Sequence, residues 1–486
     1  MTRYKRVLLV MPTLPGVYAA PPNPSITLGY LSEVLIENRI EHEVLDMRFG
    51  YALEDLKEKI RKFKPDIIGF SVFTYRHDIP YNYAEDIKKD FPQIAILFGG
   101  PHPSTIKKQI LQESVADFSL IREGEDILVD LCKGKPFNEI NGLIYRNGKE
   151  IIQNQDAGFV DVHKLPFPKY SKFELDRYLR KQINIMTSRG CPYSCTYCSI
   201  KTTVGKPMRM RTPESVAEEV KYWYDKGYRN IDFTDDNFAF DRQRTLDICK
   251  ELKKLNLKGL KITICNGIRA DKVDREVLTT MKEVGVYEIS MGVDGGNNKM
   301  MKANKRGETV EQVEEAIKIA CELDYTVDLF FIIGMPQETA EDIKQSIKLA
   351  LKYPINNANF YNAVPFPGTE LYDYIKKNNL FVVKDPDYLN GMAHYDDPIF
   401  ETPEFPVEER RRILRLTKKA EKEILRRTFV RKLKRFGILS ELSSHIIFFK
   451  PVYKTIQNMT YRSSSFKKVL IILTERLNLR RMESIR

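Results

Sequence analysis

Short apolar runs alternate with amphipathic stretches along the first 133 residues. The runs are rich in Val, Ile, Leu and Phe, which is typical of strands buried on both faces of a parallel sheet. The predicted strands are Val7–Met11, His42–Asp46, Asp66–Ser71, Ala95–Phe98 and Phe118–Ile121. The stretches between them repeat apolar residues at helical spacing. This alternation predicts a doubly wound, Rossmann-like α/β domain over residues 1–133, with its ligand site at the carboxyl ends of the strands.

A second alternating series occupies residues 181–385. Its predicted strands are Ile183–Thr187, Asn230–Thr234, Lys261–Cys265, Tyr287–Met291, Val327–Ile333 and Ala358–Asn362. Six β/α repeats favour a partial (β/α)6 barrel over a complete eightfold one. Residues 134–180 contain the prolines of a Leu-Pro-Phe-Pro-Lys segment, which bias the chain toward an extended conformation, so we expect a linker there.

The β pattern ends after residue 385, and residues 386–486 are predicted to form a basic helical region. Residues 405–486 hold 22 Lys or Arg against 7 Asp or Glu, which more than accounts for the net charge of +12. Val407–Lys434 reads as a basic, moderately amphipathic helix, and short apolar runs follow at Ile446–Phe449 and Val469–Leu473. The helix is either solvated and packed on the barrel, or attracted to anionic lipid head groups through Arg410 and its neighbours beside Ile413 and Leu414.

Several classes of protein are disfavoured by the bulk sequence. No apolar run approaches the length needed to span a bilayer, and the N-terminus passes from charged residues directly into a strand-like run without a cleavage signal. We therefore expect a cytoplasmic protein, or one peripheral on the inner face of the membrane. The basic tail carries neither an RNA-binding signature nor interleaved stacking aromatics, so nucleic acid is not an expected partner.

Three of the seven cysteines fall within eight residues. Cys191, Cys195 and Cys198 form a C-x3-C-x2-C run directly after the first strand of the second series. Three thiolates from one loop fill three of the four ligand positions of a 4Fe-4S cubane and leave one iron open. Structural zinc is the alternative, but zinc usually takes four protein ligands in paired spacings, and no fourth ligand is nearby in the sequence. The remaining cysteines stand singly in apolar contexts and are expected to be buried and inert: Cys132, Cys249, Cys265 and Cys321.

This loop, with Tyr197 just before its last cysteine, resembles the signature of the radical SAM superfamily. The resemblance implies a 4Fe-4S cluster that transfers one electron to S-adenosylmethionine (SAM). It further implies homolysis to methionine and a 5′-deoxyadenosyl radical, and hydrogen abstraction from an unactivated carbon. An external one-electron reductant of the flavodoxin or ferredoxin type is then an expected partner.

Further positions resemble the SAM-binding residues of the family. Asp235 or Asp236 ends the second strand, where the family places groups for the SAM amino group, and Arg269 resembles the arginine that meets the SAM carboxylate. Asp294 lies in a Gly-Val-Asp-Gly-Gly turn that departs from the family's Gly-Val-Glu-Ser-Gly, which weakens its assignment. The alternatives are helix capping for the two adjacent aspartates and a surface position for Arg269.

The first domain resembles the cobalamin-binding domain that precedes this kind of barrel. Gly99 and Gly100 follow its fourth strand, and glycines at a strand end let a bulky planar ligand approach the backbone. The D-x-H-x-x-G motif that supplies a cobalt ligand is absent, its nearest analogue being Asp46–Gly50, so we expect cobalt without a histidine from that motif. His102 is a conceivable contact to the cobalt, but a histidine in such a turn is expected to be solvated. The alternative is an unliganded flavodoxin-like domain.

Together these resemblances imply a cobalamin-dependent radical SAM enzyme. The predicted reaction is C-methylation at an unactivated carbon of an apolar small molecule, such as a lipid, an isoprenoid or a tetrapyrrole-like compound. Three alternatives stay open: a cobalamin-dependent radical SAM cyclase or oxidoreductase, a tRNA methylthiotransferase, and a non-catalytic iron–sulfur electron carrier. The methylthiotransferases carry a second cluster on N-terminal cysteines, whereas the first cysteine here is Cys132.

Overall fold

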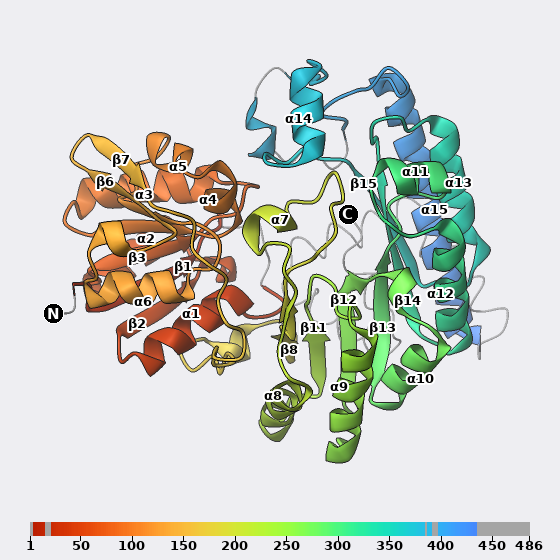
Figure 1. Ribbon diagram of the computed structural model, residues 1–486, viewed down its shortest axis with the longest axis horizontal. Coiled ribbons are helices and arrows are strands. Elements are labelled where there is room, and N and C mark those ends of the chain that lie inside the picture. Colours follow the sequence, from red (N-terminus) through yellow and green to blue (C-terminus); the bar gives the residue numbers. More distant parts are fainter. Residues whose placement is uncertain (1–2, 15–20, 384–385, 391–396, 435–486) are drawn as a thin grey trace.

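Two α/β domains stand side by side in the computed structural model, which describes residues 3–14, 21–383, 386–390 and 397–434. Figure 1 shows the N-terminal domain in red to orange and the barrel in green to blue, with the short helix α7 (Ile200–Thr203) on the side of the barrel that faces the first domain. The doubly wound α/β domain and the partial barrel predicted from the sequence are both confirmed.

The first domain is built on a seven-stranded sheet in the order β2-β1-β3-β4-β5-β6-β7. Five parallel strands form its centre: β1 (Arg6–Met11), β2 (Glu41–Asp46), β3 (Ile67–Ser71), β4 (Ala95–Gly99) and β5 (Phe118–Leu120). One face packs against α1 (Ile26–Glu37) and α6 (Glu125–Lys133), and the other against α2 (Leu53–Phe63), α3 (Asp78–Asp90) and α5 (Gln109–Gln112). The strand order reverses at β1, so a ligand crevice is expected outside the carboxyl ends of these strands.

The sheet of this domain continues beyond residue 133, where the sequence predicted the domain to end. The strands β6 (Leu143–Asn147) and β7 (Glu150–Gln153) extend the sheet as an antiparallel hairpin next to β5. The two residues between them are Gly148 and Lys149, and Gly148 has the positive φ of +60° that a glycine-first hairpin turn needs. Part of the segment assigned to a linker is therefore sheet.

The second domain is a six-stranded parallel sheet curved into a partial barrel. Its strands run in the order β8 (Gln182–Ile185), β11 (Asn230–Phe233), β12 (Lys261–Ile268), β13 (Val286–Gly292), β14 (Thr326–Ile333) and β15 (Asn357–Asn362). The outer helices are α8 (Pro213–Asp225), α9 (Arg242–Leu255), α10 (Arg275–Glu283), α12 (Val310–Glu322) and α13 (Ala340–Lys352). The start of α8 follows its sequence signal, since the Thr212 hydroxyl accepts from the backbone of Ser215 and Pro213 is the first helical residue.

Short elements decorate the carboxyl end of this barrel. The two-stranded antiparallel pair β9 (Ser188–Arg189) and β10 (Arg209–Met210) brackets the cysteine loop and α7. Other short helices are α4 (Pro101–Ile106) in the first domain and α11 (Asn298–Ala303) and α14 (Glu370–Lys377) in the second. α4 and α7 lie against each other, so the cysteine loop sits at the junction of the two domains.

The C-terminal helix α15 (Val407–Lys432) packs along the outside of the barrel against β15 and α13 (Figure 1). Ile413 and Leu414, the apolar side chains that the lipid interpretation requires, are buried against the barrel, and Arg410 is fully buried rather than available to head groups. The described part of this region therefore matches the solvated basic helix. Ile446–Phe449 and Val469–Leu473 lie outside the described residues. Within the described ranges, no helix combines the length and hydrophobicity needed to cross a bilayer.

Candidate functional site

The cysteine loop begins directly after β9 and turns sharply at Gly190. Gly190 has a φ of +98°, and a Cβ atom there would lie 2.2 Å from the carbonyl oxygen of Pro207, so only glycine fits. Cys195 is buried, while Cys191 and Cys198 are half-buried. Burial raises the pKa of the Cys198 thiol to about 12. Coordination to iron would remove this proton, because a thiol bound to a metal ion is deprotonated.

Asp235 anchors the start of this loop. Its fully buried carboxylate accepts hydrogen bonds from the Thr187 backbone (2.6 Å), the Thr187 hydroxyl (2.5 Å) and the Ser188 hydroxyl (2.6 Å). The helix-cap alternative is wrong for both adjacent aspartates, because Asp241 caps α9. With both of its oxygens engaged, Asp235 has little capacity left for a ligand.

Asp236, next in the chain, is less committed. Its Oδ2 accepts from the backbone of Gly190 at 3.3 Å, which is the one hydrogen bond found for it in the described part of the chain. Burial, followed by the charge of Asp235, raises the pKa of the Asp236 carboxyl to about 6. Of the two predicted aspartates, Asp236 is the one with acceptor capacity to offer an ammonium group.

Arg269 is buried, so the surface alternative is wrong for it. Its Nε donates to Asp271 (2.8 Å) and its Nη1 to the carbonyl of Arg306 (2.6 Å), and the guanidinium lies 3.6 Å from the centre of the Tyr193 ring. Its Nη2 makes no hydrogen bond to any described residue and lies 3.8 Å from a Glu308 carboxylate oxygen. One donor therefore remains for a carboxylate ligand.

Tyr197 lies within the cysteine loop and contacts Asp294 of the barrel. The Tyr197 hydroxyl donates to Oδ2 of Asp294, and the same oxygen lies 2.9 Å from Nη1 of Arg306. Burial, and then the charge of Asp294, raises the pKa of Tyr197, so the phenol stays protonated. The structure thus shows both residues supporting the loop, and a direct contact of either with SAM stays a prediction.

Two residues of this neighbourhood escaped the sequence analysis. Asn237 is 1% exposed, and within the described residues neither atom of its side-chain amide has a hydrogen-bond partner. An unsatisfied buried amide costs on the order of 1–3 kcal/mol, which points to a ligand that completes it. Its position directly after Asp235-Asp236 was the available signal. Arg306 carried no comparable signal, since it lies in a Lys-Arg-Gly-Glu turn that reads as ordinary surface.

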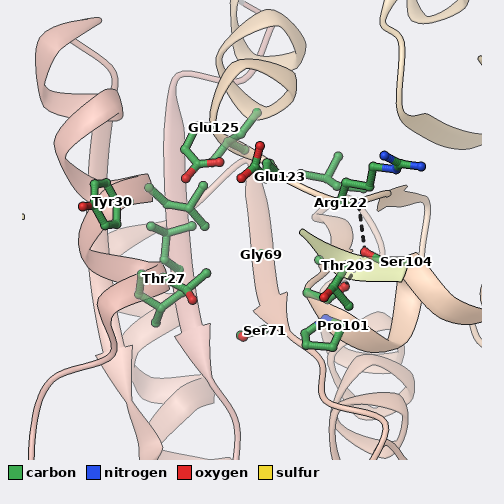
Figure 2. Close-up of a pocket in the computed structure, with 18 of the residues that line it drawn as sticks. Thr27, Tyr30, Gly69, Ser71, Pro101, Ser104, Arg122, Glu123, Glu125 and Thr203 are labelled. Carbon is green, nitrogen blue, oxygen red and sulfur yellow. Dashed lines mark hydrogen bonds between the residues drawn. The ribbon is translucent and has the colours of Figure 1, made fainter. Parts of the chain in front are cut away.

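A cavity of about 190 Å³ opens at the carboxyl ends of the first domain's strands, on the side facing the barrel. Figure 2 shows Gly69 and Ser71 on one strand, with Thr27 and Tyr30 to one side and Glu123 and Glu125 above. The rest of the lining is largely apolar and includes Leu9, Leu28, Leu31, Leu97, Leu120 and Leu128. Thr203 and Val204 complete it from the end of the cysteine loop, so the cavity belongs to both domains.

A buried group of four charges joins this cavity to the cysteine loop. Arg189 donates through Nη1 to Glu123 (3.0 Å) and through Nη2 to Glu125 (2.7 Å), and Arg209 pairs with the other oxygen of Glu123. Arg189, Glu123 and Glu125 all line the cavity. Because Arg189 stands two residues before Cys191, one side chain contacts both the cavity and the base of the cysteine loop.

Comparison with known proteins agrees with this geometry. The radical SAM superfamily profile matches residues 185–350, and the B12 binding domain profile matches residues 16–132. The chain is a radical SAM enzyme with an N-terminal B12-binding domain. The 4Fe-4S cluster, SAM and cobalamin predicted from the sequence follow from these two domains.

Three similar proteins place this radical SAM enzyme among its relatives. It is 29% identical to the uncharacterized methyltransferase PH0819 of Pyrococcus horikoshii, over 84% of this chain and 91% of that protein. It is 25% identical to the anaerobic magnesium-protoporphyrin IX monomethyl ester cyclase of Cereibacter sphaeroides, over 77% and 65%. It shares its fold with the cobalamin-dependent SAM radical enzyme OxsB, at a TM-score of 0.72 and 18% identity, over 100% of this chain and 76% of that one.

The residues around the cysteine loop of the radical SAM enzyme fit both a 4Fe-4S cluster and SAM. Three cysteines from one loop match the donor set of a cubane with one open iron. Asp236 and Nη2 of Arg269, which donates no hydrogen bond to a described residue, have opposite charges, as the amino and carboxylate groups of SAM require.

The cavity of the radical SAM enzyme likewise fits a bulky ligand. A Cβ atom at Gly99 would meet nothing within 4 Å, so this position faces open space, while Gly100 has a φ of +112° and lies close to the Val72 carbonyl. Gly100 therefore has a backbone reason to be glycine, whereas Gly99 leaves open space in the cavity for a ligand. Gly69 joins them as a lining residue that the sequence analysis missed.

His102 is not solvated, which corrects the expectation from the sequence. Its ring is 3% exposed, stacks on His77 with 4.4 Å between ring centres, and shares a hydrogen bond with the Tyr81 hydroxyl (3.1 Å). Burial, assisted by the neighbouring His77, lowers the pKa of His102 to about 3. This histidine is a packed structural residue of the B12-binding domain.

Proposed function

We propose that this radical SAM enzyme is a cobalamin-dependent C-methyltransferase. The observation that carries the proposal is that Arg189 lines the cavity of the B12-binding domain and stands two residues before the first cluster cysteine. Two cofactor sites that share a side chain are arranged to act on one substrate. When bound, the reduced cluster and SAM supply a hydrogen-abstracting radical, and cobalamin supplies a methyl group.

The protein's own side chains divide this work. Cys191, Cys195 and Cys198 hold the cluster, Asp236 orients the amino group of SAM, and Arg269 binds its carboxylate. Asp235 fixes the backbone at Thr187, immediately before the cysteine loop. The leucine-rich lining of the cavity excludes water from one side of the reaction space.

The proposal extends to the chemical character of the substrate. Phe330 and Tyr361 project from β14 and β15 on the side opposite the helix-facing Phe331 and Phe360, so they face the barrel interior and support an apolar part of the substrate. Asp232 faces the same interior from β11 and supports polar groups on it. We therefore propose a substrate with an apolar body that also carries hydrogen-bonding groups.

A labelling experiment tests the reaction. Anaerobically reconstituted protein with cobalamin, a reductant and SAM carrying a deuterated methyl group is incubated with small-molecule extract from the source cells. We expect 5′-deoxyadenosine and a product that contains the intact labelled methyl group. The second candidate is a cyclase, which the cyclase among its relatives favours. It predicts 5′-deoxyadenosine with an unlabelled product that has lost hydrogen.

The same experiment separates methyl transfer from methylthiolation and from simple electron transfer. A methylthiotransferase would add sulfur together with the methyl group and would require a second cluster on N-terminal cysteines, whereas the first cysteine of this chain is Cys132. A non-catalytic electron carrier would be reduced without cleaving SAM. Replacing each cluster cysteine by alanine should abolish 5′-deoxyadenosine formation if the chain is a radical enzyme.

A further inference from the structure

Arg306 is a buried arginine that touches the cysteine loop and that the SAM site described above does not use. It is 8% exposed, and its Nη1 donates to the sulfur of Cys195 at 3.9 Å, within reach of a hydrogen bond to sulfur. The same nitrogen lies 2.9 Å from Asp294 and 3.4 Å from the Tyr197 hydroxyl. Cys195 thus receives a contact from a charged donor inside the protein.

The remaining donors of Arg306 hold the guanidinium in one orientation. Its Nη2 donates to the carbonyl of Gly292 at 2.6 Å, and its Nε donates to Glu308 at 3.0 Å. Glu308 is itself buried and lies 3.8 Å from Arg269. The planar guanidinium of arginine carries five N–H donors and can satisfy all of these partners at once, whereas the ammonium of lysine cannot.

The charge of Arg306 is permanent at neutral pH. A guanidinium keeps its proton in proteins, and the carboxylates of Asp294 and Glu308 both lie beside it. A backbone hydrogen bond also joins the segment before Arg306 to the cysteine loop, since the Thr196 N–H donates to the carbonyl of Asn304. The charge therefore sits at a fixed place beside one cluster ligand.

We propose that Arg306 sets the reduction potential of the 4Fe-4S cluster through its hydrogen bond to the Cys195 sulfur. Reduction adds an electron to the cluster, and a neighbouring positive charge with an N–H aimed at a sulfur stabilises the reduced form. Asp294 and Glu308 hold the guanidinium in place and oppose the effect of its charge. This inference rests on the assignment of Cys195 as a cluster ligand in the proposed function.

An EPR-monitored potentiometric titration of anaerobically reconstituted protein tests the proposal without any turnover. Arg306→Met removes the charge and the hydrogen-bond donors. Arg306→Lys keeps a charge but loses the planar arrangement of donors. We expect Arg306→Met to lower the equilibrium constant for one-electron reduction at least tenfold, which corresponds to about 59 mV per tenfold change. Arg306→Lys should shift the potential in the same direction by a smaller amount.

Two further variants separate an electronic effect from structural damage. Glu308→Gln removes a negative charge beside the guanidinium and should raise the potential, in the opposite direction. Arg211→Lys is the matched control, because Arg211 is a buried barrel arginine paired with Glu219, and none of its hydrogen bonds in the described chain goes to a cysteine. Its potential should equal that of the wild type.

The outcomes decide the question in each case. Arg306→Lys and Glu308→Gln proteins that hold a full cluster at the wild-type potential would overturn the proposal, as would shifts of the same sign in both. If Arg306→Met fails to load iron, these two variants still give the answer. A wild-type protein that binds no 4Fe-4S cluster would instead refute the proposed function.

Discussion

Two neighbouring carboxylates, Asp235 and Asp236, should respond to substitution in opposite ways. Asp235 satisfies three buried donors, so Asp235→Ala leaves a backbone N–H and two hydroxyls without their acceptor. At about 1–3 kcal/mol for each of the three unsatisfied buried donors, the expected loss is on the order of 3–9 kcal/mol. This is a large part of the stability of an ordinary domain. Asp235→Asn keeps one acceptor oxygen and lets the hydroxyls rotate, so it should lose only about 1–2 kcal/mol.

Asp236 should behave differently because its charge is held at a cost. Its pKa rises from 3.8 to about 6 on folding, a change of about two units, which corresponds to about 3 kcal/mol at neutral pH. Since the folded pKa is the raised one, the favourable contribution is present below pH 3.8 and is lost as the pH rises through about 6. Asp236→Asn removes this cost and should stabilise the SAM-free protein by up to about 3 kcal/mol at pH 7.

The same variant should weaken SAM binding. We expect a loss of about 1.5–3 kcal/mol, or roughly ten- to a hundredfold in Kd, because a charged hydrogen bond to the amino group is removed. Wild-type affinity should fall as the pH drops below about 6, where Asp236 becomes protonated, while the affinity of Asp236→Asn should be flat across that range.

Urea unfolding and equilibrium SAM binding to the reconstituted protein, measured from pH 5 to 8, give both quantities. The reasoning is refuted if Asp235→Ala unfolds like the wild type, or if Asp236→Asn binds SAM as tightly as the wild type with the same pH profile. Asp235→Asn serves as the control, because it isolates the loss of charge from the loss of hydrogen bonds.

Three further substitutions test the cofactor sites. Gly190→Ala should prevent cluster loading, since its Cβ would lie 2.2 Å from the Pro207 carbonyl; iron content and the EPR signal of the reduced protein measure this. Gly99→Leu should lower cobalamin affinity at least tenfold with normal urea unfolding, because its side chain enters open space in the cavity; a wild-type cobalamin titration would contradict the site. Arg189→Met leaves Glu123 and Glu125 without this partner in a buried setting and should cost about 3–5 kcal/mol in urea unfolding, whereas an unchanged midpoint would show that the ion cluster does not join the domains.

Strand and helix periodicity was sufficient to derive both domains from the sequence. The strands are continuous apolar runs because helices or other strands cover them on both faces, as Ile67–Ser71 illustrates with every residue buried. The hairpin of β6 and β7 was missed because β7 is only partly buried and lacks such a run, so Gly148 in its turn was the main signal.

Some residues of the functional site could be predicted from the sequence, and others required the fold. The three cysteines could be predicted from their residue type and spacing, and Arg269 from its resemblance to the family arginine. The roles of Asp235 and Asp236 could not be separated from the sequence, since only the fold shows which carboxylate meets Thr187 and Ser188. Arg306 was invisible for the same reason: its contact with Cys195 spans 111 positions along the chain.

Two buried arginines, Arg189 just before the cysteine loop and Arg306 against Cys195, hold the loop through charged contacts. Buried ion pairs such as that of Arg189 with Glu123 are often no more stabilising than apolar residues of the same volume, so stability alone does not account for them. A guanidinium that donates to two carboxylates is fixed in one orientation, whereas contacts between apolar side chains are not directional. Arg189 therefore fixes the register of the loop against the B12-binding domain, and Arg306 fixes it against the barrel. Chemistry that passes between two cofactors requires this kind of fixed separation, because a misplacement of about 1 Å can cost roughly a hundredfold in rate.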